Sequence, residues 1–265
     1  MNVAVLMKQV PDTDEVKMNP DTGTMIRDGV GGIVNPLDLN ALEAAMNIRE
    51  AGDVVAIVSM GPPKAEEVLR EGLALGADRA ILATDRMFAG SDSLSTANVL
   101  ATTLKKIGLP DLIIAGEKAT DGETGQVGPG VAALLGIPVA THVTRLEKLP
   151  GVQEIEIDCT VEDGILTQRI KLPCLVTVLS DINTLRLPTL SGKKRAYSET
   201  VKVFSASELA LSEADAGLAA SPTKVVKIAH SKITRRAEKF MAKKQEELDA
   251  GLDRVVEILA GAAII

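Results

Sequence analysis

The chain has 265 residues, and its 29 Lys and Arg against 36 Asp and Glu give a formal net charge of −7 at pH 7. This acidic balance, with no Trp, one Tyr and three Phe, argues against nucleic-acid binding, which needs a basic surface and stacking platforms. The longest apolar runs fall far short of the ~18 residues that a membrane span needs. Because the N-terminus already reads as a strand rather than a signal peptide, we expect a cytoplasmic protein.

The first half of the sequence alternates strand-like and helix-like segments. Continuous runs of Val, Ile, Leu and Ala predict strands, and amphipathic runs punctuated by Pro, Asp and Gly predict the helices between them. The predicted strands cover residues 2–9, 53–60, 79–83 and 111–115, and the predicted helices cover residues 39–50, 64–75, 93–107 and 128–135. Asp38 is the predicted N-cap of the first helix. This alternation predicts an α/β fold with a doubly wound, mostly parallel, Rossmann-like sheet.

The pattern changes after residue 141. Three shorter strand-like runs, at residues 152–157, 165–172 and 174–179, with a turn at Glu162-Asp163-Gly164, predict antiparallel strands that extend the sheet. His142 also reads as a strand residue.

The last third of the chain loses this periodicity. Residues 205–224 are rich in Ser and Ala and read as a linker, and the apolar residues beyond them recur with helical spacing over about seven turns. We therefore predict a nucleotide-binding α/β domain over residues 1–182, a loop and linker over residues 183–224, and a C-terminal helical arm over residues 225–265. The arm packs on a partner chain or, alternatively, docks on its own domain.

Residues 115–130 form the most informative motif, because a Gly-rich stretch joins a predicted strand to a predicted helix. They read Ala-Gly-Glu-Lys-Ala-Thr-Asp-Gly-Glu-Thr-Gly-Gln-Val-Gly-Pro-Gly. Glycines let backbone approach a ligand closely, and the free N–H groups of a helix N-terminus favour an anion. Because the stretch matches neither standard phosphate-binding pattern, it indicates either a cradle for a nucleotide phosphate or an ordinary Gly-rich turn.

The sequence does not indicate a cluster of catalytic or metal-ligating residues. Cys159 and Cys174 form no CxxC pair and read as reduced core residues. His142 and His230 lie far apart in sequence and have no evident triad partners. We therefore predict no catalytic side chain and no metal site, which is consistent with a protein whose chemistry is carried by a cofactor.

Five motifs follow one another along the chain: Val5-Leu-Met-Lys-Gln-Val-Pro-Asp-Thr, Asn35-Pro, Val58-Ser-Met-Gly-Pro-Pro, Ala74-Leu-Gly-Ala-Asp-Arg and Asp121-Gly-Glu-Thr-Gly-Gln-Val-Gly-Pro. Together they resemble the beta subunit of the electron transfer flavoproteins over nearly the whole chain. The resemblance implies an adenine-nucleotide alpha-hydrolase-like sheet, an alpha subunit that carries FAD, and a second nucleotide in the beta subunit. That nucleotide is a structural AMP in the conventional type. In the electron-bifurcating type it is a second FAD, which takes hydride from NADH and sends one electron to the alpha-subunit FAD and the other to ferredoxin.

The resemblance also implies which residues hold this nucleotide. The backbone N–H groups and hydroxyls of residues 120–127 would hold phosphate, whereas Leu6 and Met60, at strand ends, would flank the adenine. The full set that carries over is Leu6, Asn35, Pro36, Leu37, Asp38, Met60, Gly116, Thr120, Asp121, Gly122, Glu123, Thr124, Gly125, Gln126 and Val127.

A further segment bears on the type of family member. Ala89, Gly90, Ser91, Asp92 and Ser93 resemble the loop of bifurcating members, and they open a predicted helix whose N-terminus suits pyrophosphate or ribose. The alternative is a capped helix start without a ligand. The resemblance therefore favours the bifurcating type, with FAD as cofactor and NAD(H) as substrate, over the conventional type with AMP.

The segment Leu187-Pro-Thr-Leu190 resembles the family's recognition loop. There a leucine docks into a partner such as an acyl-CoA dehydrogenase, an enoyl-CoA reductase or a hydroxy-acid dehydrogenase. Leu190 matches that leucine, and a single exposed leucine framed by polar residues suits a transient anchor. The alternative is an ordinary surface loop with one buried leucine.

Two other functions compete with this interpretation, and the position of the motif in the chain rules out the first. Gly90-Ser-Asp-Ser superficially resembles the Ser-Gly-Gly-x-Asp-Ser loop of ATP-pyrophosphatase-type adenylating ligases. That loop follows the first strand of those enzymes, however, whereas here it follows the third. The other reading is a nucleotide-binding regulatory module that carries no electrons, which flavin content would distinguish from an electron carrier.

Overall fold

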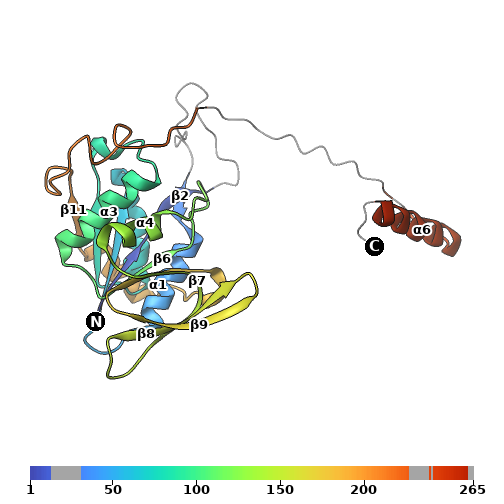
Figure 1. The fold of residues 1–265 in the computed structure, drawn as a ribbon, viewed down its shortest axis with the longest axis horizontal. Coiled ribbons are helices and arrows are strands. Elements are labelled where there is room, and N and C mark those ends of the chain that lie inside the picture. Colours follow the sequence, from blue (N-terminus) through green and yellow to red (C-terminus); the bar gives the residue numbers. More distant parts are fainter. Residues whose placement is uncertain (13–30, 227–238, 240, 262–265) are drawn as a thin grey trace. The chain divides into compact units, whose positions relative to one another are not determined.

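The computed structural model describes residues 1–12, 31–226, 239 and 241–261. The chain forms two compact units, Met1–Ile228 and Ala229–Ile265. The first unit is built on a nine-stranded sheet with the strand order β11-β5-β4-β1-β6-β10-β7-β8-β9, of which Figure 1 labels β11, β6, β7, β8 and β9. This α/β architecture confirms the predicted fold class.

The sheet is parallel from β11 to β7, because every neighbouring pair in that run is parallel. Its strands in spatial order are β11 (Val201–Phe204), β5 (Arg79–Ala83), β4 (Val54–Met60), β1 (Asn2–Leu6), β6 (Leu112–Gly116), β10 (Cys174–Val178) and β7 (Val139–Lys148). The chain order reverses beside β1, which pairs with β4 on one side and β6 on the other. The carboxyl ends of β1 and β6 therefore form a topological switch point, where ligands bind in folds of this class.

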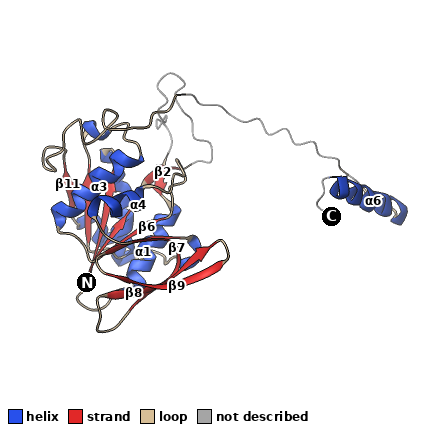
Figure 2. Ribbon diagram, in the orientation of Figure 1, coloured by secondary structure: helices blue, strands red, loops and turns tan. Residues whose placement is uncertain are grey.

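Helices cover both faces of the sheet (Figure 2). Alternate residues of β1 point to opposite faces, so Val5 joins an apolar cluster under α1 and α2, whereas Leu6 joins one under α3 and α4. The core rests on Val, Ile, Leu and Ala, as the scarcity of aromatics requires. The helices are α1 (Pro36–Ile48), α2 (Glu66–Leu75), α3 (Ser93–Ile107), α4 (Val127–Leu135) and α5 (Leu190–Ser198), with short 3-10 turns η1 (Pro63–Ala65), η2 (Arg86–Phe88) and η3 (Ser180–Ile182).

The start of α1 differs from the prediction. The helix begins at Pro36, and Asn35 rather than Asp38 occupies the N-cap position. Proline is favoured at the first helical position because its missing N–H has no helical partner there and its φ is already helical. Asp38 consequently lies in the first turn and uses its carboxylate for other contacts, described below.

The strands after residue 141 are partly as predicted. β8 (Glu154–Val161) and β9 (Gly164–Lys171) form an antiparallel hairpin that continues the sheet from β7, as drawn in Figure 1. The predicted antiparallel direction is wrong for β10, which lies between β6 and β7 and is parallel to both. All five residues of β10 are buried, which is typical of a central parallel strand covered on both faces.

The segment from residue 183 to residue 226 is more ordered than predicted. The predicted loop around Leu190 contains α5, and β11 adds an edge strand beside β5. Residues 205–224 are not a linker, because Ala206, Leu209 and Ala216 are buried in the cluster under α3 and α4. Their Ser- and Ala-rich composition is ambiguous, because small side chains also permit close packing. The first compact unit therefore includes the segment predicted as a linker.

Two small features complete the description. β2 (Gln9–Pro11) and β3 (Gly32–Val34) form a separate antiparallel pair. Cys159 and Cys174 are free and buried, as predicted. None of the helices in the described ranges is long and apolar enough to cross a membrane.

The second unit contains one described helix, α6 (Gln245–Gly261). It lies within the predicted C-terminal arm, and the apolar positions 237 and 240 of the predicted pattern lie outside the described residues. None of its residues is buried. The apolar residues Leu248, Leu252, Val255 and Val256 are all exposed, and their spacing places them on one side of the helix.

Candidate functional site

Asp38 lies at the switch point and joins the two strands that flank it. Its Oδ2 accepts a hydrogen bond of 2.8 Å from the N–H of Lys8, just beyond β1, and its Oδ1 accepts one of 3.2 Å from the N–H of Gly116, at the end of β6. Burial raises the pKa of Asp38 to about 7, against the opposing effect of hydrogen bonds from Asn35, Lys8 and Gly116. A Cβ on Gly116 would lie 2.5 Å from Asp38 Oδ1, so only glycine fits there.

Asn35 fixes the loop that follows β6. Its side-chain amide is buried, donates from Nδ2 to the carbonyl of Lys118 at 3.0 Å and accepts at Oδ1 from the N–H of Thr120 at 3.2 Å. Its own N–H donates to the carbonyl of Lys8 at 2.9 Å. Because a buried amide strongly favours satisfied hydrogen bonds, Asn35 sets the position of the Gly-rich loop relative to β1.

Two further side chains hold this loop. Lys8 Nζ lies 2.6 Å from Asp121 Oδ1, and the Asp121 side chain is almost fully buried. Ser93 Oγ, at the start of α3, donates to Gln126 Oε1 at 2.8 Å. Lys8 was not among the predicted site residues, although its position near the end of the predicted first strand was a signal that could have identified it.

The Gly-rich loop leaves several backbone donors available. Among the described residues, the N–H groups of Thr124, Gly125 and Val127 have no hydrogen-bond acceptor. The N-terminus of α4, which begins at Val127, has no side-chain cap. Gly125 has a φ of 61° and Glu123 one of 50°, which is the left-handed region that glycine adopts without strain. Open space surrounds the position of a Cβ on Gly122.

The predicted segment at residues 89–93 is largely engaged in contacts within the chain. The Asp92 carboxylate caps α3 through the N–H of Ser95 at 3.0 Å and also accepts from Thr223, whose Oγ1 lies 2.7 Å away. Burial raises the pKa of Asp92, but these hydrogen bonds outweigh burial and hold the pKa below its usual value. Ser91 Oγ donates to the carbonyl of Phe88 at 2.8 Å. Ser93 is therefore the residue of this segment whose side chain reaches the Gly-rich loop.

The remaining predicted residues lie around the same edge of the sheet. Leu6 is buried under α3 and α4, and Met60 ends β4, which pairs with β1. Pro36 is the first residue of α1. Leu37 packs closely against Gly116, because a Cβ added at Gly116 would lie 2.7 Å from the Cβ of Leu37. The structure therefore brings the predicted loops after β1, β4 and β6 together with the start of α1.

One pair beside the loop had no signal in the sequence. His142 lies in β7, as predicted, but at a φ of 57°, where the register with β10 shifts. Its Nε2 is 3.9 Å from Glu117 Oε1, and that oxygen is 3.1 Å from the position of a Cβ on Gly125. A local bulge of this kind re-aims a side chain, and no periodicity predicts it.

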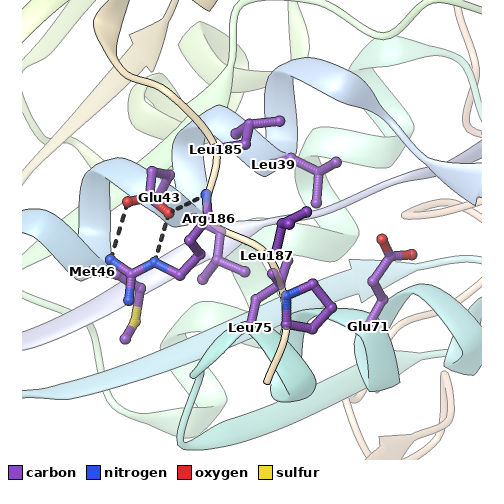
Figure 3. A pocket seen from close by; sticks show the side chains of 10 residues that line it. Leu39, Glu43, Met46, Glu71, Leu75, Leu185, Arg186 and Leu187 are labelled. Carbon is purple, nitrogen blue, oxygen red and sulfur yellow. Dashed lines mark hydrogen bonds and ion pairs between the residues drawn. The ribbon is translucent and has the colours of Figure 1, made fainter. Parts of the chain in front are cut away.

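Two hollows in the first unit lie away from the Gly-rich loop. One, of about 190 Å³, is formed by α1, α2 and residues 185–188 and is lined mainly by Leu and Met side chains (Figure 3). Within it Arg186 points to Glu43, and its guanidinium donates hydrogen bonds of 2.6 and 3.0 Å and its backbone N–H one of 3.2 Å to that carboxylate. The other hollow, of about 610 Å³, lies beside η2 and residues 213–224. In the described part of the chain, no three His, Cys, Asp or Glu side chains are placed to hold a metal ion.

Comparison with known proteins decides the family. Residues 22–209 match the electron transfer flavoprotein domain. An electron transfer flavoprotein subunit beta from Thermoanaerobacterium thermosaccharolyticum is 42% identical over 257 residues, which cover 96% of this chain and 98% of that protein. The chain belongs to the family of electron transfer flavoprotein beta subunits.

Two further relatives match most of the chain, and one of them is named as a subunit of a complex. The caffeyl-CoA reductase-Etf complex subunit CarD of Acetobacterium woodii is 44% identical, covering 85% of this chain and 86% of its own. Protein FixA of Azorhizobium caulinodans is 40% identical, covering 86% of this chain and 84% of its own. Membership in this family makes the chain an electron-transfer subunit that works with an electron transfer flavoprotein alpha subunit.

Proposed function

We propose that this beta subunit binds FAD at the Gly-rich loop and, with its alpha subunit, acts as an NADH-dependent, electron-bifurcating carrier. When bound, FAD supplies hydride acceptance from NADH and the release of single electrons toward the alpha-subunit FAD with its partner dehydrogenase and toward ferredoxin. The alternative is a conventional subunit that holds a structural AMP at the same loop.

The observation that carries this proposal is the set of donors at the Gly-rich loop. The free N–H groups of Thr124, Gly125 and Val127 lie within four residues of one another at the uncapped N-terminus of α4. Free N–H groups at the start of a helix suit a phosphate. Asn35 and Lys8 hold the loop from behind, so these donors are already in place before a ligand arrives, which lowers the entropy cost of binding.

A dinucleotide is favoured over AMP by the contact between the two helix starts. Ser93, the first residue of α3, donates to Gln126, which directly precedes α4. The Ser93 hydroxyl therefore lies beside the start of α4, where a pyrophosphate would compete with Gln126 for its hydrogen bond, whereas the N-terminus of α3 itself is capped by Asp92. The chain needs no general acid or base for this function, because its residues bind and orient the cofactor.

The partner class is supported by one relative and one surface. CarD takes its name from a complex with caffeyl-CoA reductase, which favours an acyl-CoA dehydrogenase-like or related flavin enzyme as the electron partner here. Leu190 is 86% exposed, as an anchor for such a partner needs to be.

The proposal is tested by adding a charge at Gly125 in the complex with the alpha subunit. Gly125→Asp places a carboxylate among the free N–H groups and strains a residue with positive φ, so we expect loss of the beta-subunit nucleotide with the alpha-subunit FAD retained. Gly136→Asp is the control, since Gly136 has a similar φ of 68° at the far end of α4, with open space around it. Full nucleotide content in Gly125→Asp would overturn the assignment of this loop.

A further inference from the structure

The Gly-rich loop carries more negative than positive charge. Residues 116–127 contain three acidic side chains, Glu117, Asp121 and Glu123, and one basic side chain, Lys118. Loops that bind phosphate commonly bring a lysine to the phosphate oxygens. The free N–H groups at the start of α4 are neutral, so the pairing of the ionised side chains around them determines which phosphates the loop favours.

Two of the three carboxylates are paired with lysines. Asp121 Oδ1 lies 2.6 Å from Lys8 Nζ, and Glu123 Oε2 lies 3.9 Å from Lys118 Nζ. Each of these lysines is thus balanced by a carboxylate, and neither adds net positive charge to the loop. A phosphate at the loop is therefore held by neutral N–H groups.

The third carboxylate, that of Glu117, packs against the middle of the free N–H groups. The backbone N–H of Glu117 donates to the carbonyl of Val178 at 3.0 Å, which fixes the residue at the end of β10. Its Oε1 lies 3.1 Å from the position of a Cβ on Gly125, whose own N–H is one of the free donors. The side chain is only 19% exposed, so solvent and salt screen its charge less than that of a surface carboxylate.

Glu117 has a histidine where the other two carboxylates have lysines. In the described part of the chain its ion-pair partner is His142, with 3.9 Å between Nε2 and Oε1. The bulge in β7 that gives His142 its positive φ directs the ring toward the loop. A histidine carries a positive charge only when it is protonated, so it offsets less of the negative charge than a lysine would.

We propose that Glu117 is a specificity-determining residue of the nucleotide loop, because its carboxylate disfavours the doubly charged phosphate monoester of AMP relative to the singly charged phosphodiester groups of FAD. The proposal rests on the proposed function, since it names what makes the loop choose between the two nucleotides. A phosphate monoester carries about 1.5 to 2 negative charges at pH 7. Because Coulomb repulsion is proportional to the product of the charges, the carboxylate penalises the monoester about twice as strongly as a diester.

The test uses the complete heterodimer, freed of its beta-subunit nucleotide by dialysis with the alpha-subunit FAD retained, and two probes, AMP and AMP methyl ester. The methyl group removes one negative charge from the phosphate and leaves the adenosine unchanged. Titrations at pH 8 keep AMP doubly ionised. In Glu117→Gln we expect the Kd of AMP to fall about tenfold and that of the methyl ester about threefold, so that the ratio of the two falls about threefold. The Kd of FAD should change like that of the methyl ester.

Three further variants separate charge from packing. Glu117→Asp keeps the charge and should keep the ratio near the parent value, whereas a purely structural role of the glutamate would make both substitutions at this position behave alike. Glu162→Gln removes the same charge at the exposed turn between β8 and β9 and should leave both Kd values unchanged. His142→Lys places a permanent cation beside Glu117 and should lower the ratio in the same direction as Glu117→Gln.

An unchanged ratio in Glu117→Gln, or in His142→Lys if the first variant does not fold, would overturn the proposal. So would failure of the parent heterodimer to bind either probe. The proposed function fails by a different result: a heterodimer that is purified with AMP in its beta subunit would contradict FAD as the resident nucleotide, and the ratio of the two Kd values would still report on Glu117.

Discussion

Asp38 combines a structural position with an unusual titration. Its hydrogen-bond donors include the backbone N–H groups of Lys8 and Gly116, and burial raises its pKa to about 7. Because the pKa in the folded state lies above that of an unfolded Asp, the folded state binds more protons between about pH 4 and 7. The stability that this group contributes is therefore complete below its unfolded pKa and is lost as the pH rises through 7.

We expect Asp38→Asn to remove this pH dependence. We compare the free energy of unfolding of the variant with that of the parent at the same pH. This difference, variant minus parent, should rise by roughly 2–3 kcal/mol from pH 5 to pH 8. The variant also loses one hydrogen-bond acceptor, and that loss destabilises it at both pH values. Only the change of this difference with pH therefore reports on the titration of Asp38. Urea unfolding at the two pH values measures it. A constant difference, or one that worsens toward pH 8, would contradict the raised pKa.

Single residues of the site could be predicted only where the motif is local. The Gly-rich stretch at residues 115–130 predicts a turn between strand and helix, because glycine and the flanking apolar runs act over a few positions. Its supports at Lys8, Asn35 and His142 come from distant parts of the chain. Their roles depend on which strands become neighbours, and no local pattern contains that information.

At the scale of elements, the segment at residues 205–224 shows what composition hides. Gly217 has a φ of 77°, and a Cβ there would collide with the carbonyl oxygen of Met87. Gly151 has the same φ but has open space around it. The two glycines therefore share the same positive φ and differ in the packing around them.

We expect Gly217→Ala to lower the free energy of unfolding by about 2–4 kcal/mol and Gly151→Ala by about 1 kcal/mol. The excess at Gly217 measures how tightly the segment packs against η2. Thermal or urea unfolding of both variants gives the comparison. Equal effects would mean that residues 205–224 behave as the linker that their composition suggested.

Most helices and parallel strands could be predicted from the sequence, whereas their partners could not. Buried runs such as residues 111–115, bounded by Pro and Gly, identify an element without saying where it lies in the sheet. The direction of β10 and the addition of β11 depend on pairing with strands that are distant in the sequence. Helix α5 was missed because arginines hold it, one of them from α2, rather than an apolar stripe.

At the scale of the whole molecule, α6 carries an apolar stripe that is not buried within the described part of its own unit. Leu248, Leu252, Val255 and Val256 are all exposed, and such a stripe marks a protein interface. In a subunit that works with an alpha subunit, we propose that this stripe packs on that partner.

We expect Leu252→Glu to weaken the heterodimer at least tenfold, because it buries a charge in the interface. Ala250→Glu adds the same charge at an exposed position well away from the stripe, and it should leave the affinity within about twofold. Analytical ultracentrifugation with the alpha subunit measures both. Equal weakening by the two variants would point to charge rather than to the stripe, and no weakening by Leu252→Glu would remove α6 from the interface.

The identity of the second nucleotide is the central claim at this scale, and it is tested most directly by cofactor content. The chain is produced with its alpha subunit, the purified heterodimer is denatured, and FAD and AMP are quantified per heterodimer. The proposed function predicts two FAD and no AMP. One FAD and one AMP would contradict it and would make residues 116–127 the site of a structural nucleotide.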